Sequence, residues 1–222
     1  MKPRLLDLFC GAGGAAKGYQ RAGFYVVGVD SKPQPNYCGD DFVQYDAMTV
    51  SIVTVAGGRF DAIHASPPCQ RYSTLAARSP DHEYPDLYAA IRLRLMVTGL
   101  PWIIENVIGA PYRSGFVLCG SMFGLKVRRH RNFESSHVFM PPACDHARQG
   151  RVLGVYGNGG GGSMTRGFKA NQRDWPEIMQ MPWAKPQEIA QAIPPAYTEW
   201  IGGELLRVLA ASAPRGTPAD QV

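Results

Sequence analysis

The sequence predicts an α/β domain with a mostly parallel β-sheet flanked by helices. Two observations carry this prediction: short apolar runs alternate with helical stretches, and the first run ends in a glycine-rich turn that opens a helix. With 222 residues, of which 45% are hydrophobic, the chain can enclose one such core. If the chain formed two full domains, neither would have enough residues for its own core.

The first unit of this fold occupies the N-terminal residues. Residues 4–9 predict a strand, the turn Cys10-Gly11-Ala12-Gly13-Gly14 follows, and residues 15–22 predict a helix. Residues 25–30 then predict a second strand that ends in Asp30. Such a βαβ unit implies parallel strands joined by a right-handed crossover.

Later segments extend the same pattern. Short apolar runs predict strands at residues 42–45, 61–65 and 101–107, and helical patterns are found at residues 84–98 and 195–211. Prolines at positions 67 and 68 end the strand predicted at 61–65, because proline cannot donate to a ladder.

Four segments follow from these patterns. Residues 1–134 are predicted to form the core, and residues 135–170, which contain Pro141-Pro142 and a glycine run, a small basic loop or insertion. Residues 171–212 should return to complete the core, and residues 213–222 should form a tail.

Composition limits the class of protein. The five cysteines are scattered without a CxxC pair, which argues against a disulfide framework and fits a reducing compartment. No apolar run reaches about 18 residues, and the N-terminus lacks the layout of a signal peptide. We therefore expect a cytoplasmic protein without a membrane partner.

The net charge of +5 is unevenly spread. Residues 126–173 contain nine Lys or Arg against Glu134 and Asp145, a balance of +7, so the rest of the chain sums to −2. A basic segment on a near-neutral body favours a polyanionic partner, although a solvated basic loop would have the same composition.

Three groups of residues carry possible chemistry. The glycine turn, with Asp30 at the end of the next strand, is typical of nucleotide-like ligands, but many binders share it. Cys69 lies in a proline-stiffened loop where a strand ends, the place where open α/β sheets carry nucleophiles. Glu105, at the end of an apolar strand, could act as an acid with a raised pKa. Taken singly, each could be structural: a tight turn, a buried thiol, or a capping acid.

In order along the chain, these motifs resemble the DNA (cytosine-5)-methyltransferase family. The residues that carry the resemblance are the opening Asp7–Gly14, Pro68-Cys69-Gln70, Glu105-Asn106-Val107, Arg129-His130-Arg131, and Ala192–Tyr197 near the C-terminus. Three positions depart from the family pattern: Asp30 stands where Glu is usual, Val127 replaces Gln, and Gln191 replaces Asn.

The resemblance implies a Rossmann-like S-adenosylmethionine-dependent methyltransferase fold and methyl transfer to carbon 5 of cytosine. By this resemblance, the catalytic residues are Cys69, Glu105, Arg129 and Arg131. The residues implied for S-adenosyl-L-methionine are Asp7, Phe9, Gly11, Gly13, Asp30, Asp46, Pro68, Gln191 and Ala192. Those implied for the substrate are Gln70, Ser73 and Asn106.

The chain is also smaller than usual for this family, and the missing part is the one that recognises the substrate. Family members usually carry a separate target-recognition domain, for which only residues 135–170 remain, so the chain resembles compact orphan enzymes of bacteriophage. Double-stranded DNA with a flipped base is the expected partner, and a protein partner could help recognition. RNA or a free cytosine nucleotide could instead be the substrate, and a catalytically silent DNA-binding role is the hypothesis from another class.

Metal binding is not predicted. Cys144-Asp145-His146 follows His130 and His137, which makes a zinc site conceivable, but the spacing matches no strong zinc pattern. We therefore assign no metal from the sequence.

Overall fold

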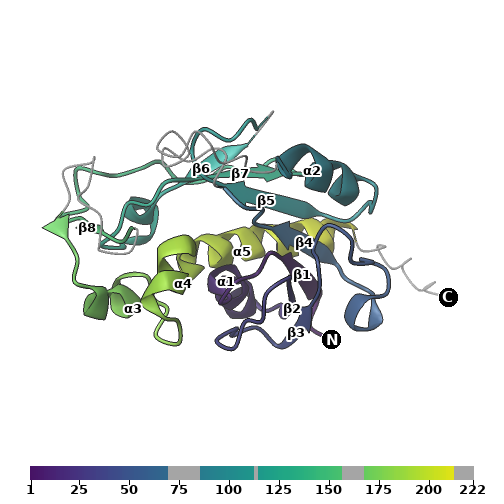
Figure 1. Cartoon of the computed structure of the whole chain (residues 1–222). Helices are drawn as coiled ribbons and strands as arrows, with labels where there is room; N and C mark the ends of the chain where they lie inside the picture. Colours follow the sequence, from purple (N-terminus) through teal and green to yellow (C-terminus); the bar gives the residue numbers. More distant parts are fainter. Residues whose placement is uncertain (70–85, 113–114, 157–167, 213–222) are drawn as a thin grey trace.

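Seven strands form one central sheet in the computed structural model, which describes residues 1–69, 86–112, 115–156 and 168–212. The strand order is β3-β2-β1-β4-β5-β7-β6 (Figure 1). The bounds are β1 Arg4–Leu8, β2 Tyr25–Asp30, β3 Asp41–Gln44, β4 Ala62–Ala65, β5 Trp102–Asn106, β6 Phe116–Leu118 and β7 Arg131–Ser135. A separate two-stranded sheet pairs β8 (Leu153–Gly154) with β9 (Phe168–Lys169).

The helices are short except for the last one. Their bounds are α1 Gly14–Ala22, α2 Tyr88–Met96, α3 Trp175–Ile178, α4 Pro186–Gln191 and α5 Pro195–Ser212. Three 3₁₀ turns are η1 Val55–Gly57, η4 Gly120–Phe123 and η6 Gln172–Asp174.

The direction of the strands changes at one edge of the sheet. Strands β3, β2, β1, β4 and β5 are parallel, whereas β7 runs antiparallel to β5 and β6 antiparallel to β7. The end of β5 therefore lies beside the beginning of β7, with Asn106 opposite Asn132. This reversal brings residues from two distant chain segments to one point.

Alternate residues of each strand enter two apolar cores. Leu5 and Ile103 pack with residues of α1 and α5 on one face, while Leu6 and Ile104 pack with residues of α2 on the other. Because successive side chains of a strand point to opposite faces, a strand covered on both sides reads as a continuous apolar run. This explains why the parallel strands are visible in the sequence.

Helices α1 and α5 lie against each other (Figure 1). A Cβ atom at Gly18 would stand 2.1 Å from both the Pro195 carbonyl oxygen and Thr198 Oγ1. Thr198 Oγ1 donates to the Ala15 carbonyl oxygen at 2.8 Å. The contact between the two helices therefore requires a residue without a side chain at position 18.

The predicted α/β fold is confirmed, and the predicted elements agree with the structure to within a few residues. The differences are that strands β6 to β9 and helices α3 and α4 were not anticipated, and that the helix expected at 84–98 is α2 over the described residues Tyr88–Met96. The tail 213–222 and the glycine run at 159–162 lie outside the described residues. Within 135–170, Phe139 and Val155 are buried in the core that α1 and α5 cover. None of the described helices is both long and apolar enough to cross a membrane.

Candidate active site

The loop that carries Cys69 begins where β4 ends and is held by β5. Asn106 Nδ2 donates to the Pro67 carbonyl oxygen at 3.0 Å, and Asn106 Oδ1 accepts from the Val107 amide at 2.9 Å. Asn106 is 1% exposed, so these bonds form away from water, where leaving either group unpaired would be costly. The geometry gives Asn106 a positioning role; its predicted contact with substrate remains a prediction.

Glu105 and Arg131 form a partly buried ion pair where β5 meets β7. Arg131 Nε lies 3.1 Å from Glu105 Oε1, and the two side chains are 13% and 11% exposed. Burial raises the pKa of Glu105 above its usual value, and the positive charge of Arg131 opposes the rise. The carboxyl group is therefore closer to neutral than an exposed glutamate, which suits an acid that protonates or donates a hydrogen bond.

Cys69 is half-buried in the same electrostatic environment. Burial and the charge of Glu105 raise the pKa of the Cys69 thiol, whereas Arg131 and Arg129 lower it. A proton on Glu105 would remove the repulsive charge and favour the thiolate, which is the nucleophilic form. The two groups thus support each other in an acid-plus-nucleophile arrangement.

A relay of hydrogen-bonded polar side chains leads from Tyr19 through His64 and Ser66 to Glu105. The Tyr19 hydroxyl lies 2.9 Å from His64 Nδ1, and His64 Nε2 lies 2.9 Å from the Ser66 hydroxyl. Ser66 in turn hydrogen-bonds Glu105, which lowers the pKa of that carboxyl. Burial lowers the pKa of His64 to about 3, so the imidazole is neutral.

This relay was not predicted from the sequence. The sequence feature that could have indicated the relay is the pair His64 and Ser66 at the end of an apolar strand. The two polar residues are separated by one position, which places both on one face of the strand.

Arg129 is turned toward the protein interior. It is 1% exposed, and its guanidinium donates to the Val155 carbonyl oxygen at 2.7 Å and to the Ala190 carbonyl oxygen. Burial and the neighbouring Arg131 lower the pKa of Arg129 to about 10. Of the two predicted arginines, Arg131 contacts Glu105, while Arg129 joins the core to the segment after β7 and to α4.

The glycine turn has the backbone that close approach of a ligand requires. Gly11 and Gly13 adopt φ values of 49° and 85°, and Phe9 also has a positive φ of 60°. Asp30 Oδ2 accepts from the Gly11 amide at 3.1 Å, so the acid at the end of β2 holds the turn in place. A Cβ at Gly11 would meet nothing within 4 Å, which leaves this side of the turn open.

Asp7 provides a test of whether a cofactor fits. Its side chain is fully buried in β1, and neither carboxylate oxygen has a hydrogen-bond partner. Burial, and secondly the charge of Asp30, raise its pKa well above the usual value. Two carboxyl groups around an open glycine turn suit a ligand that brings positive charge and hydroxyl donors, as S-adenosylmethionine does.

The C-terminal segment closes the other side of the turn. A Cβ at Gly14 would stand 2.6 Å from the Ile193 carbonyl oxygen and 3.1 Å from the Ala192 Cβ, so the residues that follow α4 lie against the start of α1. Trp183 Nε1 donates to the Ala12 carbonyl oxygen at 2.8 Å, a contact that the sequence did not indicate. Residues after α4 and Trp183 therefore lie against the glycine turn; that residues 171–212 as a segment complete the core remains a prediction.

The remaining predicted residues are placed as follows. Asp46 is exposed after β3, where its Oδ1 accepts from the Met48 amide at 2.8 Å, and Pro68 and Gln191 are also exposed. Gln70 and Ser73 lie outside the described residues. The structure thus gathers Cys69, Glu105 and Arg131 at one point and the glycine turn, Asp30 and Ala192 at another.

Comparison with known proteins agrees with this geometry. Residues 3–108 match the family model described as C-5 cytosine-specific DNA methylase. This match, which includes Cys69 and Glu105, covers just under half of the chain. This part of the chain is similar to the C-5 cytosine-specific DNA methylases.

A curated relative of this chain is the type II methyltransferase M.AgeI of Thalassovita gelatinovora. The two are 31% identical over 134 residues, which cover 54% of this chain. The chain spans 31% of the length of that relative.

Solved methyltransferases share the fold of this chain. A protein encoded within an E. coli prophage, described as a DNA modification methyltransferase, aligns with a TM-score of 0.65 at 16% identity, over 94% of this chain and 99% of that chain. The Dnmt2 methyltransferase of S. pombe aligns with a TM-score of 0.64 at 14% identity, over the same shares. At these identities the likeness establishes the Rossmann-like methyltransferase fold.

Proposed function

We propose that the chain transfers a methyl group from S-adenosylmethionine to carbon 5 of cytosine in DNA, through a covalent bond between Cys69 and carbon 6. The observation that carries this proposal is the meeting of a half-buried thiol with the Glu105–Arg131 pair at the ends of β4 and β5. The match of residues 3–108 to the cytosine-specific family supports the substrate class.

The residues of the chain have distinct roles in this proposal. The Cys69 thiolate adds to carbon 6, and the electron pair of the 5,6 double bond moves toward carbon 5 while protonated Glu105 engages ring nitrogen 3. Arg131 holds the Glu105 carboxyl in place, and Asn106 holds the loop that presents the thiol. Once carbon 5 has taken the methyl group, with S-adenosylhomocysteine as the leaving group, loss of the carbon 5 proton restores the double bond and releases the thiolate.

The cofactor would be held by the glycine turn and the acids around it. S-adenosylmethionine supplies an electrophilic methyl group on a positively charged sulfur. We assign Gly11 and Gly13 to its close approach, Asp30 to its ribose hydroxyls and Asp46 to its adenine amine. Asp7, Phe9, Pro68, Gln191 and Ala192 complete the proposed binding set.

DNA is the proposed partner, with the target base flipped from the duplex because carbon 6 is covered within a base stack. Residues 135–170 would take the place of a larger recognition domain, with or without a protein partner. We further propose that the protein acts in the cytoplasm of a bacterial or phage-infected cell.

The deciding experiment is mass spectrometry of nucleosides from cells that express the chain. We expect 5-methylcytosine in DNA from cells with the wild-type chain and none with Cys69→Ser or Glu105→Gln. Glu204→Gln, a change on α5 away from the site, is the matched control and should retain the product. If RNA or free nucleotides were methylated while the DNA stayed unmodified, DNA would not be the substrate. If Cys69→Ser still methylated cytosine, the covalent route would be wrong.

A further inference from the structure

A second cluster of reactive side chains lies outside the set of residues proposed for the active site. Cys119 follows β6, His130 precedes β7, and Cys144 and His146 lie in the segment after β7. Their potential ligand atoms all lie within 4.8 Å of one another. Three chain segments therefore converge on one point, and we call these four residues the Cys2His2 cluster.

The distances within the Cys2His2 cluster are those of a metal site. Cys119 Sγ lies 3.3 Å from His146 Nε2, and Cys144 Sγ lies 3.6 Å from His130 Nε2. Zinc–sulfur bonds of about 2.3 Å and zinc–nitrogen bonds of about 2.0–2.1 Å place sulfur and nitrogen about 3.6 Å apart in a tetrahedron. Two thiolates and two imidazoles are also a donor set typical of structural zinc.

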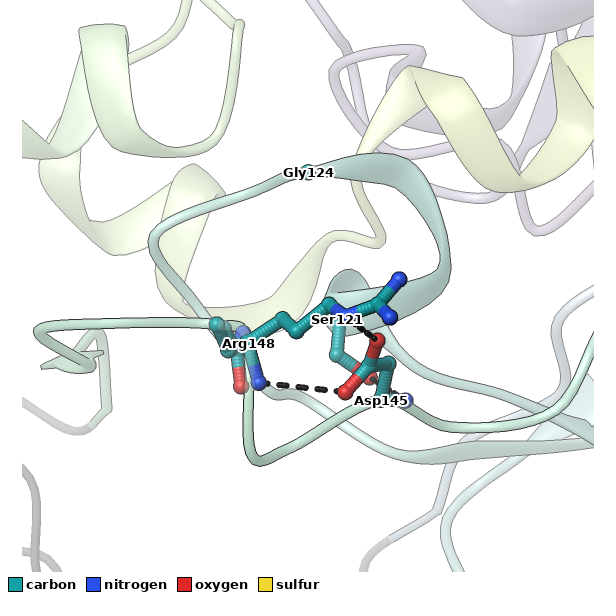
Figure 2. Close-up of a pocket in the computed structure, with 5 residues that line it drawn as sticks. Ser121, Gly124, Asp145 and Arg148 are labelled. Carbon is teal, nitrogen blue, oxygen red and sulfur yellow. Dashed lines mark hydrogen bonds and ion pairs between the residues drawn. The ribbon is translucent and has the colours of Figure 1, made fainter.

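The surroundings of the cluster orient its ligands. The Ser121 hydroxyl lies 3.3 Å from Cys119 Sγ, to which it donates, and accepts from the Asp145 amide at 3.2 Å. Outer hydrogen bonds of this kind fix the position of metal ligands. Ser121 and Asp145 also line an adjacent pocket of about 210 Å³. Asp145 pairs there with Arg148 (Figure 2).

We propose that the Cys2His2 cluster binds one Zn²⁺ ion as a structural site. The ion would join the segment after β7 to the beginning of that strand, where His130 stands between Arg129 and Arg131. The sequence did not predict this metal, because the residues considered there included His137 and omitted Cys119, which is fully buried and distant in the sequence. His137 is not a member of the cluster.

Metal content of the purified full-length chain tests the proposal without reference to methyl transfer. Elemental mass spectrometry should find about one zinc per chain, and a cobalt-loaded sample should show the strong visible bands of tetrahedral thiolate ligation. Cys144→Ser and His146→Gln should lower the zinc content at least about tenfold. His137→Gln is the matched histidine control and should keep the metal.

Three results would overturn the site. The first is folded wild-type protein that contains no zinc and takes up neither zinc nor cobalt. The second is a disulfide between Cys119 and Cys144 in protein kept under reducing conditions. The third is adventitious zinc only, which would be seen as equal zinc content in the wild type, Cys144→Ser and His146→Gln. The cobalt spectrum of the wild type decides the matter if a variant fails to fold.

Discussion

At the scale of single residues, Glu105 is governed by opposing influences. Burial favours its neutral form, whereas Arg131 and the Ser66 hydroxyl favour the charged form. Ser66 is itself tied to neutral His64, so the acid is connected through hydrogen bonds to Tyr19 in α1. The pKa of Glu105 should therefore respond to substitutions that never touch the substrate.

Ser66→Ala should shift the pH profile of methylation. The change removes a hydrogen bond that lowers the pKa of Glu105, so that pKa should rise further. If Glu105 acts in its protonated form, activity falls as pH rises through this pKa, and the variant should stay active to higher pH. The measurement is kcat/KM against pH on duplex DNA, with exposed Ser51→Ala as the control. A pH profile that stays in place or moves to lower pH would show that the Ser66 hydroxyl does not lower the pKa of Glu105.

Asp30→Ala should weaken cofactor binding. The variant loses the acceptor that holds the Gly11 amide and, in our proposal, the partner of the ribose hydroxyls. A hydrogen bond to a charged group is worth about 1–3 kcal/mol, or roughly 5- to 150-fold in affinity. Calorimetric titration with S-adenosylhomocysteine measures the loss, and Asp41→Ala, an exposed change in β3, should bind normally. Equal affinities of the two variants would mean that Asp30 is not a cofactor ligand.

At the scale of elements, the contact between α1 and α5 places both the glycine turn and the segment before α5. Gly18→Ala should destabilise the fold by about 1–3 kcal/mol, because its Cβ would overlap the Pro195 carbonyl oxygen and Thr198 Oγ1. This cost exceeds the gain of about 1 kcal/mol that alanine brings to a helix.

The matched control for that change is Gly203→Ala in α5, where a Cβ would meet nothing within 4 Å. Urea unfolding should show a loss of stability for Gly18→Ala and no loss, or a gain of up to about 1 kcal/mol, for Gly203→Ala. Equal effects would mean that helix propensity, and not packing, decides both positions.

Individual elements differ in how well the sequence predicts them. Strands β1, β2, β4 and β5 are covered on both faces, so their residues form apolar runs, and the glycine turn marks the start of α1. Strand β7, between β5 and the edge strand β6, mixes polar and apolar residues, so the sequence does not mark it as a strand. The burial of Arg129 could likewise not be predicted, because the carbonyl groups that accept from its guanidinium come from segments distant in the sequence; its catalytic role stays a prediction.

At the scale of the whole molecule, part of the basic charge is used internally. Lys126 pairs with Glu177 at 3.3 Å and Arg131 with Glu105, two acids that lie outside residues 126–173. The balance of +7 over residues 126–173 therefore overstates the positive charge available to a polyanion. In the proposed function, recognition of DNA would depend on shape as well as charge.

Acid should destabilise the whole fold through His64. Its pKa is about 3 in the folded protein against about 6.5 in an unfolded chain, so unfolding takes up a proton between these values. The stability that neutral His64 contributes is complete above about pH 6.5 and is lost as pH falls toward 3. This slope approaches about 1.4 kcal/mol per pH unit.

Urea unfolding between pH 7.5 and 4.5 measures this dependence. His64→Gln should show a shallower fall in the free energy of unfolding than the wild type, whereas His137→Gln, at an exposed position, should follow the wild type. Parallel curves for His64→Gln and the wild type would show that His64 is not protonated on unfolding.

The packing of α5 and the end of α4 against α1 also sets an order in time. A ribosome makes the glycine turn and Cys69 early, but residues 186–212, which lie against the turn and its helix, emerge more than one hundred residues later. A nascent chain would therefore carry Cys69 well before the segment that packs against the glycine turn exists. In the proposed function, competence for methyl transfer should arise only once that late segment has docked.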